Sequence, residues 1–279
     1  MKNRLYFCLF AIILLSASGT LLAQDYAYHP ALSDRFTVIL GAFKSNNAFN
    51  VEADVLGDPG EDIDFDDSLN VSDSSTFLSG QIRWKFSKKK RWSLAGQYFS
   101  NDATGESVLT KDVEWDGHTF REGSFVNSGV KLAVTRLFIG RSFILNDRND
   151  IGAGIGIHNL DMNIFIEGEI EIDEETTGFQ RAEVGDNQPL PNVGGWYSFS
   201  PAKKWLLHGR VDWISANIGD YDGTLWNVNA GVNYQAWRHV GIDLSWQYFN
   251  LDLKVDKSDW KGKADMTYSG PVLAITGNW

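Results

Sequence analysis

Apolar and polar residues alternate along most of the chain after Asp25, which is the pattern of β-strands with two different faces. The segment 226–236 shows it most clearly, because Trp, Val, Ala and Tyr hold the even positions while Asn, Gly and Gln hold the odd ones. The same alternation recurs at 78–86, 151–158, 205–213 and 240–248. The pattern predicts an all-β chain built as one domain.

The lengths of the strand-like stretches and of their connections distinguish a membrane barrel from a soluble sandwich. The stretches run for about 9 to 14 residues, whereas strands of soluble sheets most often have about 5 to 6. Short polar turns at 87–91, 146–150, 200–204 and 237–238 separate longer connections at 44–74, 100–125, 159–190, 215–224 and 251–264. This layout predicts a transmembrane antiparallel β-barrel with short periplasmic turns and long extracellular loops.

Aromatic residues gather at the strand ends, as in the two girdles of a membrane barrel. The girdle beside the short turns would contain Phe86, Trp92, Phe143, Phe199, Trp205, Tyr234 and Trp237. The second girdle would contain Tyr98, Trp213, Trp226, Trp246 and Tyr248. The final strand ends on the aromatic Trp279, which is common in outer-membrane proteins and agrees with this interpretation.

About ten spanning strands are expected, an even number as in bacterial single-chain barrels. Their expected ranges are 34–43, 75–87, 91–100, 126–144, 150–158, 192–200, 204–214, 224–236, 239–249 and 266–279. Phe49–Leu56 and Ile63–Phe65 could pair as a hairpin above the membrane, or could enter the wall and make twelve strands. The Asp-Gly pair at 116–117 predicts a two-residue hairpin turn joining Val108–Trp115 to Thr119–Phe125.

Residues 1–23 have the organisation of a secretory signal peptide, and residues 24–279 would then form the barrel domain. Lys2 and Arg4 precede an apolar stretch from Leu5 to Leu15, and small residues follow up to Ala23. An N-terminal anchor helix is the alternative, although the apolar stretch is short for one. The signal predicts export to the cell outer membrane.

Net charge and cysteine content exclude several classes of protein. The formal net charge of −11 and the pI of about 4.9 argue against nucleic acid as a partner, because a nucleic-acid binder needs a basic face. The single cysteine, Cys8, lies in the predicted signal peptide, which leaves neither a disulfide framework nor a thiolate metal site.

The polar faces of the strands predict a hydrogen-bonding lumen. Its expected residues are Gln81, Arg83, Lys85, Lys131, His208, Arg210, Asp212, Asn227, Asn229, Asn233, Asp243 and Gln247. A barrel of about ten strands is narrow enough for side chains to fill it, and charges of both signs favour internal pairing. We therefore expect a largely filled lumen, with a selective pore or a ligand cavity as the alternative.

Two connections are rich in carboxylates, which are ligands for Ca²⁺ or Mg²⁺. The densest candidates for a weak metal site are Asp62, Asp64, Asp66, Asp67, Asp220 and Asp222, and a second acidic run covers 167–175. None of these matches an EF-hand loop, and the alternative is an ordinary solvated surface. No cofactor is expected beyond such weakly bound cations.

Nothing in the sequence forms a recognisable catalytic motif. His158 is expected near the outer rim of the barrel as a polar filler, with no serine beside it in sequence. Glycines at 152, 154 and 156 lie within a strand, where they would make room for larger neighbours, and do not form a dinucleotide-binding loop. We expect no catalytic residues; the alternative is a surface enzyme, such as a lipid A-modifying or other hydrolase.

Five short segments, in this order, are similar to a group of uncharacterised outer-membrane β-barrel proteins of Gram-negative bacteria. They are Ile63–Leu69, Gly154–Leu160, Pro189–Gly194, Ile218–Gly223 and Tyr268–Pro271. The resemblance covers essentially the whole chain after the signal, and implies the fold and the location without an activity. Expected partners are outer-membrane lipid, lipopolysaccharide and the barrel-assembly machinery, for a protein with a porin-like structural or narrow-transport role.

Overall fold

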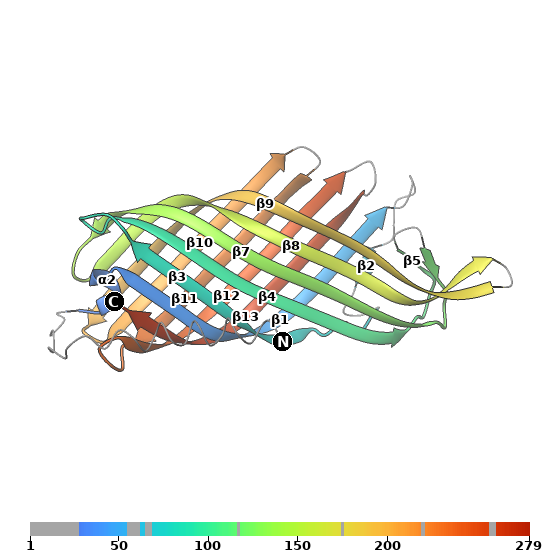
Figure 1. Ribbon diagram of the computed structural model, residues 1–279, viewed down its shortest axis with the longest axis horizontal. Helices are drawn as coiled ribbons and strands as arrows, with labels where there is room; N and C mark the ends of the chain where they lie inside the picture. The colour runs from blue at the N-terminus through green and yellow to red at the C-terminus, as the bar shows by residue number, and fades with distance from the viewer. Residues whose placement is uncertain are drawn as a thin grey trace, which may run out of the picture.

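Ten long antiparallel strands form a closed barrel in the computed structural model of this chain (Figure 1). They are β1 (Phe36–Asp54), β3 (Ser74–Lys85), β4 (Trp92–Val108), β7 (Phe125–Leu145), β8 (Asn149–Asp173), β9 (Thr176–Ala202), β10 (Trp205–Ile218), β11 (Tyr221–Tyr234), β12 (Val240–Asp256) and β13 (Lys261–Asn278). The structure describes residues 28–54, 62–64, 69–115, 118–173, 176–218, 221–256 and 261–279. The predicted signal peptide lies outside these residues.

The wall closes between the first and last strands. β1 pairs with β13 from Thr37 opposite Asn278 to Asp54 opposite Lys261. The Trp279 carbonyl accepts hydrogen bonds from the backbone N–H groups of Arg35 and Phe36, which continue the seam. Every other neighbouring pair is also antiparallel, so the strand backbones satisfy one another around the ring, as a membrane wall requires.

Three short strands lie outside this ring of ten. β2 (Asp62–Asp64) pairs with β1, with Ile63 opposite Val51. The first arm of the hairpin predicted there continues β1 up to Asp54, so the two arms do not raise the strand number to twelve. β5 (Val113–Trp115) and β6 (His118–Phe120) form the predicted hairpin with Trp115 opposite His118. These two strands are three residues long, much shorter than the strands expected from the sequence.

The two ends of the barrel differ. The short helix α2 (Pro30–Ser33) and the C-terminus lie at one end, whereas β5 and the tip of the β8–β9 hairpin lie at the other (Figure 1). The turns after β3, β7, β9 and β11 are at the α2 end and are short, as expected. The long loops expected at 159–190, 215–224 and 251–264 are mostly strand, because β8 to β13 continue well past the apolar part of the wall.

An apolar band surrounds the half of the barrel nearer α2. Its exposed side chains include Leu94, Ile139, Leu207, Leu244 and Ile275, one strand after another. Aromatic residues expected in the girdles, among them Trp92, Trp205 and Trp213, also point outward. Such a band is the surface that a transmembrane barrel presents to lipid. Among the described residues no helix is long and apolar enough to cross a membrane.

Beyond this band the polarity of the two faces of each strand is inverted. On β7, Leu137 and Ile139 face outward in the band, but farther along Val130, Leu132 and Val134 face inward and are buried. The structure therefore places Lys131 on the outer face, where its ammonium pairs with Asp102 of β4 at 3.2 Å, and not in the lumen as expected. The lumen consequently has a polar half near α2 and an apolar half beyond it.

Candidate functional site

Helix α2 closes one mouth of the lumen, where basic side chains bind its backbone. Lys85 donates from Nζ to the carbonyls of Ala31 and Leu32, at 3.1 and 2.9 Å, and Arg83 donates to the Ala31 carbonyl at 2.9 Å. Lys90, in the turn after β3, binds the Ser33 carbonyl. One helical turn is too short to be stable alone, so these contacts hold α2 in place.

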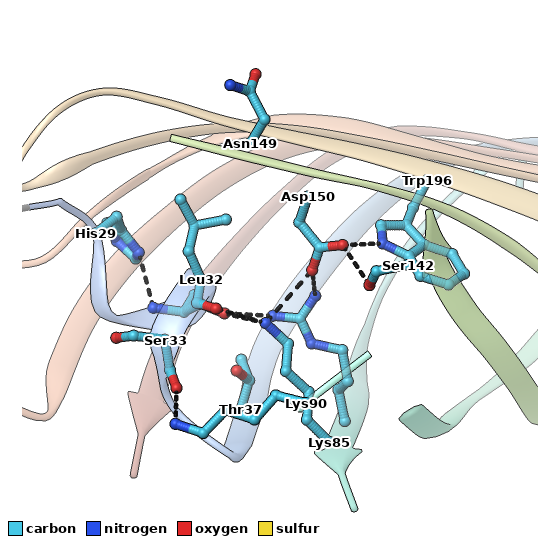
Figure 2. A network of polar contacts seen from close by, with 12 residues as sticks. His29, Leu32, Ser33, Thr37, Lys85, Lys90, Ser142, Asn149, Asp150 and Trp196 are labelled. Atoms are coloured by element: carbon cyan, nitrogen blue, oxygen red, sulfur yellow. Dashed lines mark hydrogen bonds and ion pairs between the residues drawn. The ribbon is translucent and has the colours of Figure 1, made fainter. Parts of the chain in front are cut away.

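Asp150 is the anionic partner at this mouth (Figure 2). Its carboxylate lies 3.3 Å from Lys85 Nζ and 3.8 Å from the Arg83 guanidinium, and accepts hydrogen bonds from Ser142 and from the Trp196 indole. The indole needs the bare backbone of Gly152 beneath it, because a Cβ there would overlap its ring. The glycine-rich strand thus makes room for a large lumen side chain, as the sequence predicted.

His29 connects α2 to the opposite wall. Its Nδ1 accepts from the Ala31 N–H at 3.2 Å, so Nε2 carries the proton that binds Asn233 Oδ1 at 2.9 Å. Burial lowers the pKa of His29 to about 4, and the neutral ring is the form that makes both bonds. Asn233 in turn donates to Asp243, which also pairs with His208 Nε2 at 2.8 Å.

A buried ion pair crosses the lumen farther from α2. The Arg136 guanidinium of β7 contacts both carboxylate oxygens of Asp212 on β10 at 2.7 Å. Arg210 lies 3.4 Å from the same carboxylate and extends to Gln97 of β4 at 2.6 Å and Gln81 of β3 at 3.4 Å. Since β3 and β10 are on opposite sides of the ring, Arg210 bridges the full width of the tube.

Amide side chains extend this layer around the wall. Asn227 of β11 donates to His158 Nε2 at 3.0 Å and binds Gln247 through its carbonyl oxygen. Asn229 donates to Gln247 at 3.2 Å. His158 is fully buried here, because β8 continues for 15 residues beyond it, so the expectation that it lies at the outer rim is wrong. It is a polar filler of the middle of the lumen.

Aromatic and aliphatic side chains fill the apolar half of the lumen. The Phe99 ring contacts the rings of Phe77 and Phe249, with centroids 5.8 and 5.5 Å apart, and the Phe49 ring lies 5.4 Å from that of Tyr268. Buried aliphatic side chains of β7, β10, β11 and β12, among them Leu132, Ile214 and Leu225, belong to the same cluster. The described part of this half therefore has the packing of an ordinary protein core.

A cavity of about 150 Å³ remains between the α2 mouth and the cross-lumen ion pair. Arg83, Arg136 and Arg210 contribute the cationic part of its lining and Asp243 a carboxylate, with His208 beside them. Ala95 and Ser245 belong to the remainder. A single water needs on the order of 10–15 Å³, so the space accommodates several waters or one small molecule.

The structure brings together eleven of the twelve residues expected in the lumen, all except Lys131. All eleven take part in the contacts described above, and several of them, among them Arg83, Arg210 and Asn229, also line the cavity. Sequence reasoning missed Arg136, Asp150, Trp196 and His29. Arg136 was recognisable, because it interrupts the alternating apolar residues of β7, whereas a single turn of helix has no periodicity to indicate that it enters the lumen.

The acidic metal candidates do not form a site in the described part of the chain. Asp66, Asp67 and Asp220 lie outside the described residues, and Asp222 is exposed on β11 opposite Lys254 of β12. Asp62 and Asp64 belong to β2. Within the described ranges no group of three His, Cys, Asp or Glu side chains is arranged to hold a metal ion. Weak cation binding stays a prediction.

Comparison with known proteins supports the fold. The chain matches no protein-family model and no curated protein sequence. Among solved structures it is similar to the outer membrane protease OmpT from Escherichia coli, with a TM-score of 0.52 and 11% identity over 92% of this chain and 99% of that one.

Matches to OprG from Pseudomonas aeruginosa and to the toluene transporter TodX from P. putida are more distant. OprG has a TM-score of 0.38 and 8% identity over 88% of this chain and 96% of its own. TodX has a TM-score of 0.34 and 6% identity over 88% of this chain and 90% of its own. The closed wall, its apolar band and the likeness to OmpT together show that this chain has the fold of a bacterial outer-membrane β-barrel.

Proposed function

We propose that this protein resides in the bacterial outer membrane as a non-catalytic barrel whose lumen does not conduct. The observation that carries this proposal is the sequence of three obstructions along the tube. Helix α2 covers one mouth, the Arg136–Asp212 pair crosses the middle, and the aromatic cluster around Phe99 fills the other half. The protein then acts through its surface and its presence in the membrane, with lipid and lipopolysaccharide as its neighbours.

Planar-bilayer recording of the purified full chain tests the closed lumen. The wild type should show no steady openings, because ions would have to pass buried ion pairs and a packed apolar core. A variant that lacks residues 29–33 and carries Arg136→Ala, Asp212→Ala, Phe99→Ala and Phe249→Ala weakens all three obstructions and should raise the frequency of openings. Large steady conductance of the wild-type protein would overturn the proposal.

A surface hydrolase is the competing function, since a structural neighbour is a protease. The described His–carboxylate pair, His208 with Asp243, lies in the lumen on the α2 side of the cross-lumen ion pair, away from any surface substrate. Overexpression should therefore leave lipid A mass and added peptides unchanged. A lost acyl chain or a cleaved peptide that disappears with His208→Gln would replace our proposal with a catalytic one.

A further inference from the structure

The cavity next to α2 is lined unequally by the two signs of charge. Three of the basic side chains around it retain exposed surface, at 24% for Arg83, 16% for Arg210 and 19% for His208, whereas Arg136 is covered by its pairing with Asp212. The carboxylates retain almost none, at 1% for Asp150, 0% for Asp212 and 3% for Asp243. The carboxylates are thus covered by their partners, whereas the side chains of Arg83, Arg210 and His208, which line the cavity, keep part of their surface open.

The ion-paired side chains in the polar half of the lumen also carry a net positive charge. Its described side chains include four lysine or arginine cations, Arg83, Lys85, Arg136 and Arg210, against the three carboxylates of Asp150, Asp212 and Asp243. A buried charge without a partner is costly, so an additional anion inside the barrel would be stabilising.

The excess positive charge is concentrated on two of the three arginines that line the cavity, Arg83 and Arg210. Arg83 lies 3.8 Å from Asp150, which is closer to Lys85, and Arg210 lies 3.4 Å from Asp212, which is held by Arg136 at 2.7 Å. Each arginine therefore shares a carboxylate that another cation already neutralises. Their remaining N–H groups are the donors that match a carboxylate, sulfate or phosphate.

We propose that this cavity is a binding site for one small oxyanion, of the size of phosphate, sulfate or acetate, held by Arg83 and Arg210 with His208 beside it. The volume of about 150 Å³ accommodates such an ion with accompanying water. Access is from the α2 end, because the Arg136–Asp212 pair and the apolar core lie on the other side. Since the Ala31 carbonyl also binds Arg83, α2 must shift slightly for exchange, and we expect slow exchange.

Equilibrium dialysis of the detergent-solubilised full chain with radiolabelled sulfate or phosphate tests the site directly. The protein is refolded in the presence of the anion and in constant chloride, so that slow access does not hide binding. The wild type should retain about one saturable equivalent. Acetate in excess should displace the label if carboxylates share the site, and failure of acetate alone would restrict it to tetrahedral anions.

Three variants separate the cavity from the rest of the surface. Arg83→Gln and Arg210→Gln should each weaken binding at least tenfold, whereas Arg141→Gln, which removes an exposed arginine near Trp92, should leave it unchanged. Ala95→Leu fills the cavity without altering any charge and should also abolish binding. Heat-dependent mobility on unboiled gels confirms that each variant is folded.

The proposal fails if the wild type shows no saturable retention up to millimolar anion, in which case the cavity holds water alone. It fails equally if Arg141→Gln lowers retention as much as Arg83→Gln, because the anions would then bind to the outside. Folded Ala95→Leu that binds normally would also overturn it. Bilayer conductance does not enter this measurement, so its outcome is independent of whether the lumen conducts.

Discussion

At the residue scale, Asp212 supplies the carboxylate that two arginines share in the middle of the lumen. Its carboxylate is the partner of Arg136 and also lies near Arg210, so Asp212→Asn leaves two buried guanidinium groups without it. Breaking one partner of a buried ion pair typically costs about 3–5 kcal/mol. We expect Asp212→Asn to lower the free energy of unfolding by about that amount, measured by urea denaturation in liposomes.

The matched control is Asp102→Asn on the outer face. Asp102 pairs with Lys131 at 3.2 Å, but both side chains are about half exposed, so the loss should be within about 1 kcal/mol. If the two asparagine variants unfold at the same urea concentration, the cross-lumen pair contributes no more than a surface contact. Replacing Arg136 by Met in the Asp212→Asn background should recover part of the loss, because one unpaired cation is then removed.

At the element scale, α2 should detach more readily as the pH falls. The pKa of His29 is about 4 in the folded protein, chiefly because of burial, while a released segment would have the ordinary value of 6.5. His208 and Arg83 also lower this pKa, whereas Asn233 and Asp243 raise it. Protonation therefore favours release between pH 6.5 and 4, by about 2 kcal/mol at pH 5.

Hydrogen exchange of the amides in 29–33, corrected for the intrinsic pH dependence, measures this release. Protection should fall between pH 7.5 and pH 5 in the wild type. His29→Asn retains a residue that can cap the helix and removes the titrating ring, so its protection should change little with pH. An equal loss of protection in both proteins would show that another group controls α2.

The strands themselves were largely predictable from the sequence. Alternation, turn lengths and aromatic positions predicted the ten strands and the outward girdles, because the membrane imposes one polarity along the whole band. The extensions of β8 and β9 were expected to be loops. Their inward Met162, Ile164 and Ile166 alternate with outward Asp161, Asn163 and Glu167, which is the pattern of a strand in water around an apolar core.

The rest was not predictable from local pattern. Lys131 was assigned to the lumen because a polar residue in a membrane strand normally faces inward, but beyond the band the rule reverses. The pairing of Arg136 with Asp212 joins residues 76 positions apart on strands that are not neighbours in the sheet. Such contacts form only when the ring closes and brings distant strands face to face, so the pattern within one segment does not predict them.

At the scale of the whole molecule, the outer surface is divided into a lipid-facing band and a region beyond it. Leu244 is exposed within the band, whereas Asn187 is exposed on the part of β9 that extends past it, opposite the exposed Asp161 of β8. Leu244→Arg should cost about 2–4 kcal/mol in liposomes, as arginine does at the middle of a bilayer. Asn187→Arg should change the free energy of unfolding by about 0.5 kcal/mol or less. Equal effects would contradict this boundary.

The pairing of β1 with β13 has a consequence for the order of assembly. These strands are the first and last of the ring, so the wall has two open edges until the final 18-residue strand is in place. An open edge in lipid leaves a row of backbone groups without partners, which makes a partly inserted sheet unfavourable at every earlier stage. A chain that ends before β13 therefore cannot form a stable partial barrel in lipid. We expect insertion of this protein to be all or none and to require the C-terminal strand.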